Sequence, residues 1–345
     1  MIQSVFADAT LEAFRGWMDR YERFVLLTHV SPDGDAMGSS LAMMHYLQEK
    51  GKEARVIVPN AFPDFFRWMP RVGTVVQYDF HKDTGAKLIE EAEAIICLDF
   101  NALNRIGAMG EVVAAAAKPM MLIDHHPYPA EGFEIVCSHP FMCATAEVLY
   151  RLIDALGEAD RITPDCAACL YTGLMTDTGG FTYNSVRPEI FEIVSRLLAV
   201  GVDKDEIYHR VFNSNSEGRM KLMGYTLYNK MKVYPELRTA LIWLTQDELK
   251  RFGYVKGDTE GFVNLPLQIR GVSFSCFLRE DKTMIKVSLR SVGNFSCTEF
   301  ASRLFNGGGH RNASGGEFYD TMDKAVARFE EGLEIFRPEL ERKKR

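Results

Sequence analysis

A short polar triplet, Asp124-His125-His126, ends an apolar run and is followed by Pro127. The four apolar residues before it, 120–123, are typical of a buried strand, so the triplet is expected just past the carboxyl end of that strand. In an open parallel sheet this edge is where ligands bind. Neighbouring side chains on an extended chain point in opposite directions. The two imidazoles could therefore act separately, one holding a metal ion and the other facing a substrate.

A second polar group, His29, Asp33 and Asp35, follows the apolar stretch 23–28. Pro32 and Gly34 predict a tight turn there, and the spacing of apolar residues in 36–50 predicts a helix. A histidine and two acids at a strand-to-helix turn can converge on one or two cations, and imidazole with carboxylate suits Mn²⁺ or Mg²⁺. The alternative is that the two aspartates are only turn and helix-capping residues.

Two further aspartates stand at the ends of apolar segments. Asp99 follows the predicted strand 94–98, where it could also cap the next helix. Asp177 follows the predicted helix 163–175, a position at which the helix dipole disfavours an acid. Carboxylates and imidazoles gathered this closely would repel one another unless cations were bound. The pattern therefore predicts a metal site.

The order of the elements predicts the fold class. Apolar strands at 23–28, 53–59, 94–98 and 118–123 alternate with helices, which favours a doubly wound parallel sheet. Residues 203–234 are expected to be helical without a strand, and a second alternation begins near 238. We predict an α/β protein with an N-terminal domain at 1–200, a helical linker at 201–235 and a smaller α/β domain at 236–345, with the active site in the cleft.

The second domain contains a glycine-rich segment after a predicted helix at 298–305. Gly307, Gly308 and Gly309 are followed by His310 and Arg311. Consecutive glycines can expose backbone N–H groups that cradle an anion; a plain flexible turn is the alternative. Arg290, at the end of a predicted strand, could add a guanidinium for phosphate.

Composition limits the classes of function. The 345 residues are 47% hydrophobic and 25% charged, with a net charge of −7, which argues against a protein that coats long nucleic acid. No stretch has the length and apolarity of a membrane span or the pattern of a signal peptide, so a cytoplasmic enzyme is expected. Seven scattered cysteines do not indicate a disulfide framework. Cys166 and Cys169 are expected to be packing residues of a buried helix.

The ordered set of motifs resembles the DHH phosphoesterases, and the Gly307–His310 segment is similar to the signature of the DHHA1 domain that often follows. At this length the combination resembles the NrnA-like branch of bacterial oligoribonucleases and pAp phosphatases. The resemblance spans nearly the whole chain. The motifs that carry it are His29-x3-Asp33-x-Asp35, Asp99, Asp124-His125-His126 and Asp177.

This resemblance implies two divalent metal ions, most often Mn²⁺, with Mg²⁺ or Co²⁺ as alternatives. One ion would be held by His29, Asp33, Asp99 and Asp177, and the other by Asp35, Asp99, His125 and Asp177. His126 would face the phosphate, and Asp124 would support the histidines. The substrate's phosphate or terminal nucleotide would be held by Arg290, Gly307, Gly308, Gly309, His310 and Arg311.

The resemblance further implies a metal-dependent phosphodiesterase that hydrolyses very short RNA, including the linear dinucleotides pGpG and pApA, to nucleoside monophosphates. Dephosphorylation of pAp is a second expected activity. One alternative is an enzyme like the family II inorganic pyrophosphatases, or a dedicated pAp phosphatase. Another is a non-catalytic nucleotide- or RNA-binding regulator, against which the complete ligand set argues. The expected partners are short RNA or dinucleotides, and binding to long nucleic acid or to a membrane is not expected. A homodimer is compatible with the sequence.

Overall fold

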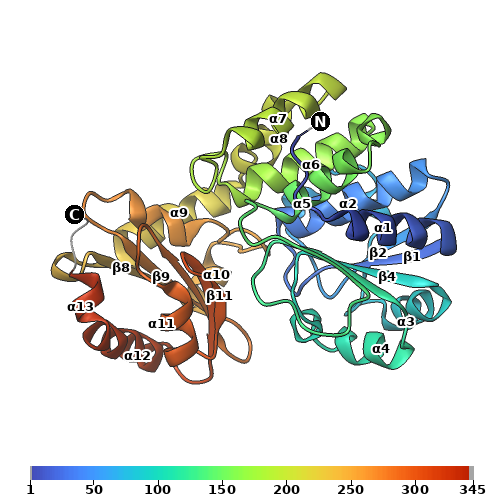
Figure 1. The fold of residues 1–345 in the computed structure, drawn as a ribbon. Helices are drawn as coiled ribbons and strands as arrows, with labels where there is room; N and C mark the ends of the chain where they lie inside the picture. Colours follow the sequence, from blue (N-terminus) through green and yellow to red (C-terminus); the bar gives the residue numbers. More distant parts are fainter. Residues whose placement is uncertain (1, 342–345) are drawn as a thin grey trace. The chain divides into compact units, whose positions relative to one another are not determined.

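The computed structural model describes residues 2–341, which form two compact units. The first unit ends at Ser214 and the second begins at Asn215, within the stretch 201–235 that the sequence predicts to be a linker (Figure 1). That stretch is helical for most of its length, as expected. The exception is Met231–Tyr234, near the end of the stretch, which form a strand, β7, of the second unit. The prediction that this stretch contains no strand is therefore wrong.

The first unit is built on a six-stranded sheet in which every neighbouring pair of strands is parallel. The order β3-β2-β1-β4-β5-β6 is that of a doubly wound sheet, which confirms the predicted class. The two outer strands, β3 and β6, are short and were not predicted. The bounds are β1 Arg23–Leu27, β2 Glu53–Val58, β3 Val76–Gln77, β4 Ala94–Leu98, β5 Met120–Asp124 and β6 Ile135–Ser138.

Helices cover both faces of this sheet (Figure 1). Successive residues of a strand face opposite sides. Leu26 accordingly belongs to the apolar core beneath α1, α2, α5, α6 and α7, whereas Leu27 belongs to the core beneath α3 and α4. The helix bounds are α1 Asp8–Arg20, α2 Gly34–Glu49, α3 Lys82–Glu91, α4 Met109–Ala116, α5 Thr145–Ala155, α6 Pro164–Asp177, α7 Pro188–Val200 and α8 Lys204–Tyr208.

Helices α2 and α6 pack closely because glycines meet at their contact. A Cβ atom on Gly38 would lie 2.6 Å from the backbone oxygen of Cys169, and one on Gly173 would lie 2.7 Å from Oδ1 of Asp35. Cys166 and Cys169 are fully buried in α6. They are packing residues, as predicted. This close approach brings the first turn of α2 against the last turns of α6, so that polar side chains at these helix ends can meet.

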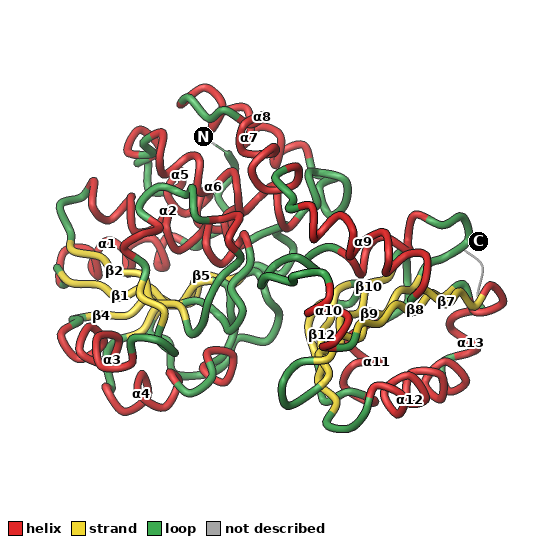
Figure 2. The backbone as a smooth tube through the Cα atoms, turned by 180° about the vertical axis from the view of Figure 1, so that it is seen from behind, coloured by secondary structure: helices red, strands yellow, loops and turns green. Residues whose placement is uncertain are grey.

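The second unit contains a mixed six-stranded sheet with the order β11-β12-β10-β9-β8-β7 (Figure 2). The β8–β9 pair is parallel and the other pairs are antiparallel. Three strands, β7, β11 and β12, were not predicted. The bounds are β7 Met231–Tyr234, β8 Thr239–Leu244, β9 Phe274–Glu280, β10 Ile285–Ser291, β11 Gly308–His310 and β12 Ala313–Phe318.

One face of this second sheet is covered by α11 and α12 through a cluster of phenylalanines that includes Phe274, Phe300 and Phe329. The opposite face packs against α9, α10 and a 3₁₀ segment, where Leu222, Leu249 and Phe262 are buried. The bounds are α9 Glu217–Asn229, α10 Gln246–Arg251, α11 Cys297–Leu304, α12 Met322–Ile335 and α13 Arg337–Leu340. Within 2–341, no helix combines the length and apolarity needed to cross a membrane.

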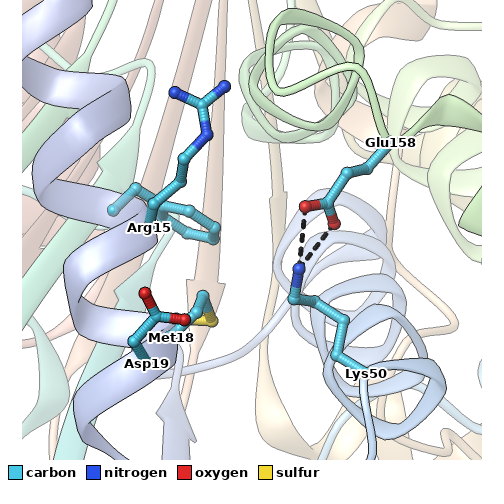
Figure 3. Close-up of a pocket in the computed structure, with 6 residues that line it drawn as sticks. Arg15, Met18, Asp19, Lys50 and Glu158 are labelled. Carbon is cyan, nitrogen blue, oxygen red and sulfur yellow. Dashed lines mark hydrogen bonds and ion pairs between the residues drawn. The ribbon is translucent and has the colours of Figure 1, made fainter.

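A small pocket of about 200 Å³ lies at the C-terminal end of α2 (Figure 3). Lys50 binds both carboxylate oxygens of Glu158 there, at 2.8 and 2.7 Å, and the Tyr46 hydroxyl donates to the same carboxylate at 2.7 Å. These bonds tie the end of α2 to the turn after α5. A helix of 16 residues is about 24 Å long. The pocket is therefore remote from Asp33 and Asp35 at the other end, and its charges are structural.

Candidate metal centre

The candidate site lies where the strand order of the first sheet reverses. From β1 the chain moves outward through β2 and β3, and then returns to β4 on the other side of β1. His29 follows β1, and Asp99 comes directly after β4. The His29 Nε2 atom lies 3.3 Å from Oδ2 of Asp99 and 3.8 Å from Oδ2 of Asp33. Such a switch point is the usual ligand site of an open α/β sheet.

Asp33 has both of the roles that the sequence left open. Its Oδ1 atom accepts hydrogen bonds from the backbone N–H groups of Asp35 and Ala36, at 3.0 and 3.1 Å, and so caps α2. Its Oδ2 atom faces His29. The His29 ring is oriented by Nδ1, which lies 3.0 Å from the backbone oxygen of Val30. With the proton on Nδ1, the lone pair of Nε2 points toward the carboxylates, as a metal ligand requires.

The Asp35 carboxylate is fully buried at the N-terminus of α5. It accepts backbone N–H groups from Thr145 at 2.6 Å and from Ala146 at 2.9 Å. Burial and the neighbouring Asp33 carboxylate raise the pKa of Asp35 to about 6, against the opposing effects of His125 and these N–H groups. Partial positive charge at the helix N-terminus stabilises the carboxylate in this place.

Asp99 has an unusual backbone conformation, with φ at +66°. Left-handed backbone is uncommon outside glycine, and such strain is concentrated at functional sites. The hydroxyl of Thr145 donates to Oδ1 of Asp99 at 2.9 Å. Burial and the charges of Asp35 and Asp33 raise the pKa of Asp99 well above its usual range. The carboxylates therefore destabilise one another when no cation is present.

His125 reaches three of these acids. Its Nε2 atom lies 3.4 Å from Oδ2 of Asp177, 3.5 Å from Oδ1 of Asp99 and 4.0 Å from Oδ2 of Asp35. Its Nδ1 atom lies 3.3 Å from the backbone oxygen of Met142. Asp177 is the last residue of α6, which extends two residues further than the predicted helix 163–175. All six predicted ligand side chains thus gather at one edge of the sheet.

His126 is oriented differently from its neighbour. Its Nδ1 atom lies 2.8 Å from Oδ1 of Asp124, which is fully buried. Burial lowers the pKa of His126, and the Asp124 carboxylate opposes that shift. Asp124 holds the ring of His126, and Asp99, Asp124 and His126 offer ligand atoms within 4.8 Å of one another. The different environments of the two histidines match the division of roles that the sequence suggested.

These side chains can hold metal ions. His29, Asp33 and Asp99 offer ligand atoms within 4.8 Å of one another, and so do Asp35, His125 and Asp177. The two groups meet through Asp99, which contacts both His29 and His125. Nitrogen and hard carboxylate oxygen in these proportions suit Mn²⁺ and similar divalent ions. The raised pKa values of Asp35 and Asp99 have the same cause, crowded buried charge that a cation would neutralise.

The sequence analysis missed the segment 142–147, which supports the site. The backbone oxygen of Met142 faces His125, and Thr145 and Ala146 bind Asp35 and Asp99. Glu147 is fully buried and fastens this segment. Its carboxylate accepts the backbone N–H of Cys143 at 2.8 Å, Nη2 of Arg187 at 2.5 Å and Nε of Arg151 at 2.9 Å. Glu147 is the third residue of α5 and has arginine at i+4, but this spacing is common on helices and gives no specific sequence signal for such a role.

The predicted substrate-binding residues lie in the second unit, and the glycine segment is not an open loop. Gly308–His310 form strand β11, paired with β12, and the N–H of Gly307 donates to the oxygen of Ala301. The segment is therefore an ordered edge strand of the sheet and not a plain flexible turn. A Cβ on Gly307 would collide with the backbone of Gly315. The glycines are needed because two backbones approach closely here.

The two arginines of this set are held by backbone oxygens. Nη2 of Arg311 donates to Asn294 at 2.9 Å, and Nη1 of Arg290 donates to Leu289 at 3.0 Å. The hydroxyl of Ser314 donates to the backbone oxygen of His310 at 2.8 Å. These bonds order the β11–β12 hairpin and the end of β10. Binding of substrate by these residues, and the predicted cleft, remain predictions.

Comparison with known proteins decides the family. The model of the DHH family N-terminal domain matches residues 23–174, and the DHHA1 domain model matches residues 242–336. The bifunctional oligoribonuclease and PAP phosphatase NrnA of Thermus thermophilus is 31% identical over 319 residues, covering 92% of this chain and 90% of that protein. The chain belongs to the DHH–DHHA1 phosphoesterase family. It is accordingly a hydrolase, as the sequence predicted.

Other relatives agree with this membership. The NrnA protein of Bacillus subtilis is 24% identical, covering 90% of this chain and 94% of that protein. The crystal structure of an exopolyphosphatase-related protein from Bacteroides fragilis is 53% identical with a TM-score of 0.94, covering 99% of this chain and 100% of that chain. RecJ from Thermus thermophilus in complex with Mn²⁺, at 12% identity and a TM-score of 0.51, covers 95% of this chain and 54% of that chain and shares the fold.

Proposed function

We propose that this DHH–DHHA1 protein is a Mn²⁺-dependent phosphodiesterase that hydrolyses very short RNA and linear dinucleotides, such as pApA and pGpG, to nucleoside monophosphates. Removal of the 3′-phosphate of pAp at the same site is part of the proposal. The observation that carries it is the convergence of His29, Asp33, Asp35, Asp99, His125 and Asp177 at the switch point of the sheet. The NrnA proteins named above support the substrate class.

Two divalent ions would be held by these six side chains. His29 and Asp33 would bind one ion, Asp35 and His125 the other, and Asp99 and Asp177 would contact both. When bound, such ions lower the pKa of water and offset charge on phosphoryl oxygens. Thr145, Ala146 and Met142 would keep the ligands in place, because their hydrogen bonds fix the orientation of Asp35, Asp99 and His125.

His126 would act on the substrate itself. Nδ1 lies 2.8 Å from Oδ1 of Asp124, so we assign Nε2, the other ring nitrogen, to a phosphoryl oxygen or to the leaving oxygen. A proton on Nε2 would stabilise negative charge that develops on the phosphate and could pass to the leaving group. Asp124 would favour that protonated ring by its negative charge, and it would keep the ring from rotating.

The second unit would supply the preference for short substrates. We assign Arg290, His310 and Arg311 to binding of a terminal phosphate, together with the backbone of Gly307–Gly309. Guanidinium and imidazole groups bind phosphate through charge-assisted hydrogen bonds. An overall charge of −7 does not favour long nucleic acid, so affinity would depend on these few groups and not on a basic surface.

The test is hydrolysis of RNAs of two, five and twenty-four nucleotides at equal strand concentration, with Mn²⁺ present and with EDTA as the control. The dinucleotide is expected to be cleaved fastest and the longest RNA slowest, with no cleavage in EDTA. Equal rates on all three lengths would refute the short-substrate proposal. Undiminished cleavage in EDTA would refute the metal site.

A second candidate activity is hydrolysis of inorganic polyphosphate. The observation in its favour is the 53% identity to the Bacteroides fragilis protein, which is described as exopolyphosphatase-related. Release of phosphate from polyphosphate and from pyrophosphate, measured beside pApA hydrolysis, separates the two. Faster turnover of either inorganic substrate than of pApA would make polyphosphate or pyrophosphate the better assignment.

A further inference from the structure

The turn after Asp177 has a strained backbone. Within residues 178–184, Gly179, Gly180, Phe181 and Asn184 all have positive φ, at +56°, +68°, +65° and +49°. Phe181 and Asn184 adopt this conformation without the freedom of glycine. Strain of this kind persists only where the surrounding structure enforces it. The turn immediately follows Asp177, a proposed metal ligand, and backbone strain of this kind is concentrated at functional sites.

Hydrogen bonds hold the turn rigidly. Thr178 is fully buried and donates its hydroxyl to the backbone oxygen of Leu174 at 2.7 Å. The same hydroxyl accepts the N–H of Phe181 at 3.0 Å, and the backbone oxygen of Thr178 accepts the N–H groups of Thr182 and Tyr183 at 2.9 and 3.1 Å. The position of Tyr183 is thereby fixed to the end of α6, and so to Asp177.

Two tyrosine rings cover the two glycines of this turn. The ring of Tyr183 lies on Gly179, where an added Cβ would collide with it, and the ring of Tyr208 lies on Gly180, with an atom 3.2 Å from an added Cβ. Both rings are half-exposed, at 49% and 44%. We call Tyr183 and Tyr208 the tyrosine ledge. Phe181 and Phe212 beside it pack against the apolar core, to which neither tyrosine of the ledge belongs.

We propose that the tyrosine ledge is a stacking surface for a nucleobase of the substrate, an inference that rests on the proposed function. Gly179 is two residues from Asp177, so its Cα lies within about 7 Å of that of the ligand residue. A nucleotide whose phosphate is at the metal centre would place its base at this range. Stacking on exposed aromatic rings is tolerant of base identity. The ledge would therefore bind purine and pyrimidine nucleotides alike.

The experiment compares AMP with ribose 5-phosphate, which lacks the base, by calorimetry in the presence of Mn²⁺. The unaltered protein is expected to bind AMP about 5- to 150-fold more tightly, the contribution of one stacked base. Tyr183→Leu keeps apolar bulk but removes the ring, and it should reduce that ratio by most of this factor. Tyr183→Phe keeps the ring and should keep the ratio.

Three results would overturn the proposal. Equal affinity of the unaltered protein for AMP and ribose 5-phosphate would mean that no base is bound. An unchanged ratio in Tyr183→Leu would mean that the base binds elsewhere. A loss of affinity for both ligands alike in this variant would show a structural role and also contradicts stacking. Because binding is measured, the result does not depend on whether pApA is cleaved, and pApA hydrolysis tests the proposed function separately.

Discussion

The hydroxyl of Thr145 donates a hydrogen bond of 2.9 Å to Oδ1 of Asp99. Thr145 is the first residue of α5, and Asp99 directly follows β4 in a left-handed conformation. The same residue gives its backbone N–H to Asp35. One threonine thus orients two acids that come from different strand-to-helix turns. Support of this kind commonly contributes 10- to 100-fold to metal affinity or activity.

Replacement of Thr145 by valine tests that contribution. The change keeps the shape and removes only the hydroxyl, so Asp99 loses one of its restraints. We expect about a 10-fold loss of Mn²⁺ affinity, measured by calorimetric titration. Thr226→Val is the matched control, because Thr226 is fully buried in α9 and its hydroxyl donates to the Leu222 backbone oxygen at 2.7 Å. Equal affinities in the two variants would show that the hydroxyl does not support the site.

Cations should stabilise the fold through Asp99. Mn²⁺ at 100 times its dissociation constant would add about 2.7 kcal/mol to the free energy of unfolding, because it binds only the folded protein. We expect a higher melting temperature in Mn²⁺ than in EDTA for the unaltered protein. Asp99→Asn should lose that increase; asparagine is chosen because it tolerates the φ of +66° at this position. An unchanged increase in the variant would argue that the cation binds elsewhere.

Substitution of each of the two adjacent histidines should have a different effect. His125→Ala removes a proposed ligand and should weaken Mn²⁺ binding. His126→Ala should leave Mn²⁺ binding intact and lower kcat by about 10²- to 10⁴-fold, the usual contribution of a proton-transferring side chain. Metal titration and kinetics on the same preparations check both statements. Equal effects of the two substitutions on metal affinity would contradict the division of roles.

Glu147 should stabilise the first unit in a pH-dependent way. Burial would raise the pKa of Glu147, but the N–H of Cys143 and the guanidinium of Arg187 hold it below its ordinary value of 4.5. A lowered folded pKa means that the stabilisation is complete above pH 4.5 and is lost as the pH falls through the folded pKa.

We therefore expect Glu147→Gln to lower the free energy of unfolding by about 3 kcal/mol at pH 7, because Arg151 is left buried without its partner. The difference from the unaltered protein should shrink below pH 4.5. Urea unfolding at pH 7 and pH 4 measures it. A difference that grew on acidification would show that Glu147 is not ionised in the folded protein.

Two neighbouring glycines at the β11–β12 hairpin allow a matched pair of substitutions. A Cβ on Gly307 would meet the backbone of Gly315, whereas a Cβ on Gly308 would have nothing within 4 Å. Gly307→Ala should therefore destabilise the second unit by about 1–3 kcal/mol through overpacking. Gly308→Ala should change stability little. Comparable losses in both variants, in thermal unfolding, would mean that close packing is not the reason for the glycine at 307.

The residues that carry chemistry were predictable because each follows an apolar segment whose end is visible in the sequence. His29, Asp99 and the Asp124-His125-His126 triplet are of this kind, and a parallel sheet brings the ends of its strands to one edge. Thr145 and Glu147 were not predictable as support, because one hydroxyl and one acid at a helix start have no distinctive pattern. Their role depends on Asp35 and Asp99, which are distant in sequence. Strand β11 was missed because glycine does not favour strands.

The most direct test of the account is AMP release from pApA by the unaltered protein and by Asp99→Asn, at saturating Mn²⁺. Asp99 contacts both histidines that would serve as ligands, so its loss should disrupt both proposed ion sites. We expect two molecules of AMP per pApA from the unaltered protein and no measurable release from the variant. AMP release by Asp99→Asn at an unreduced rate would contradict the two-metal site.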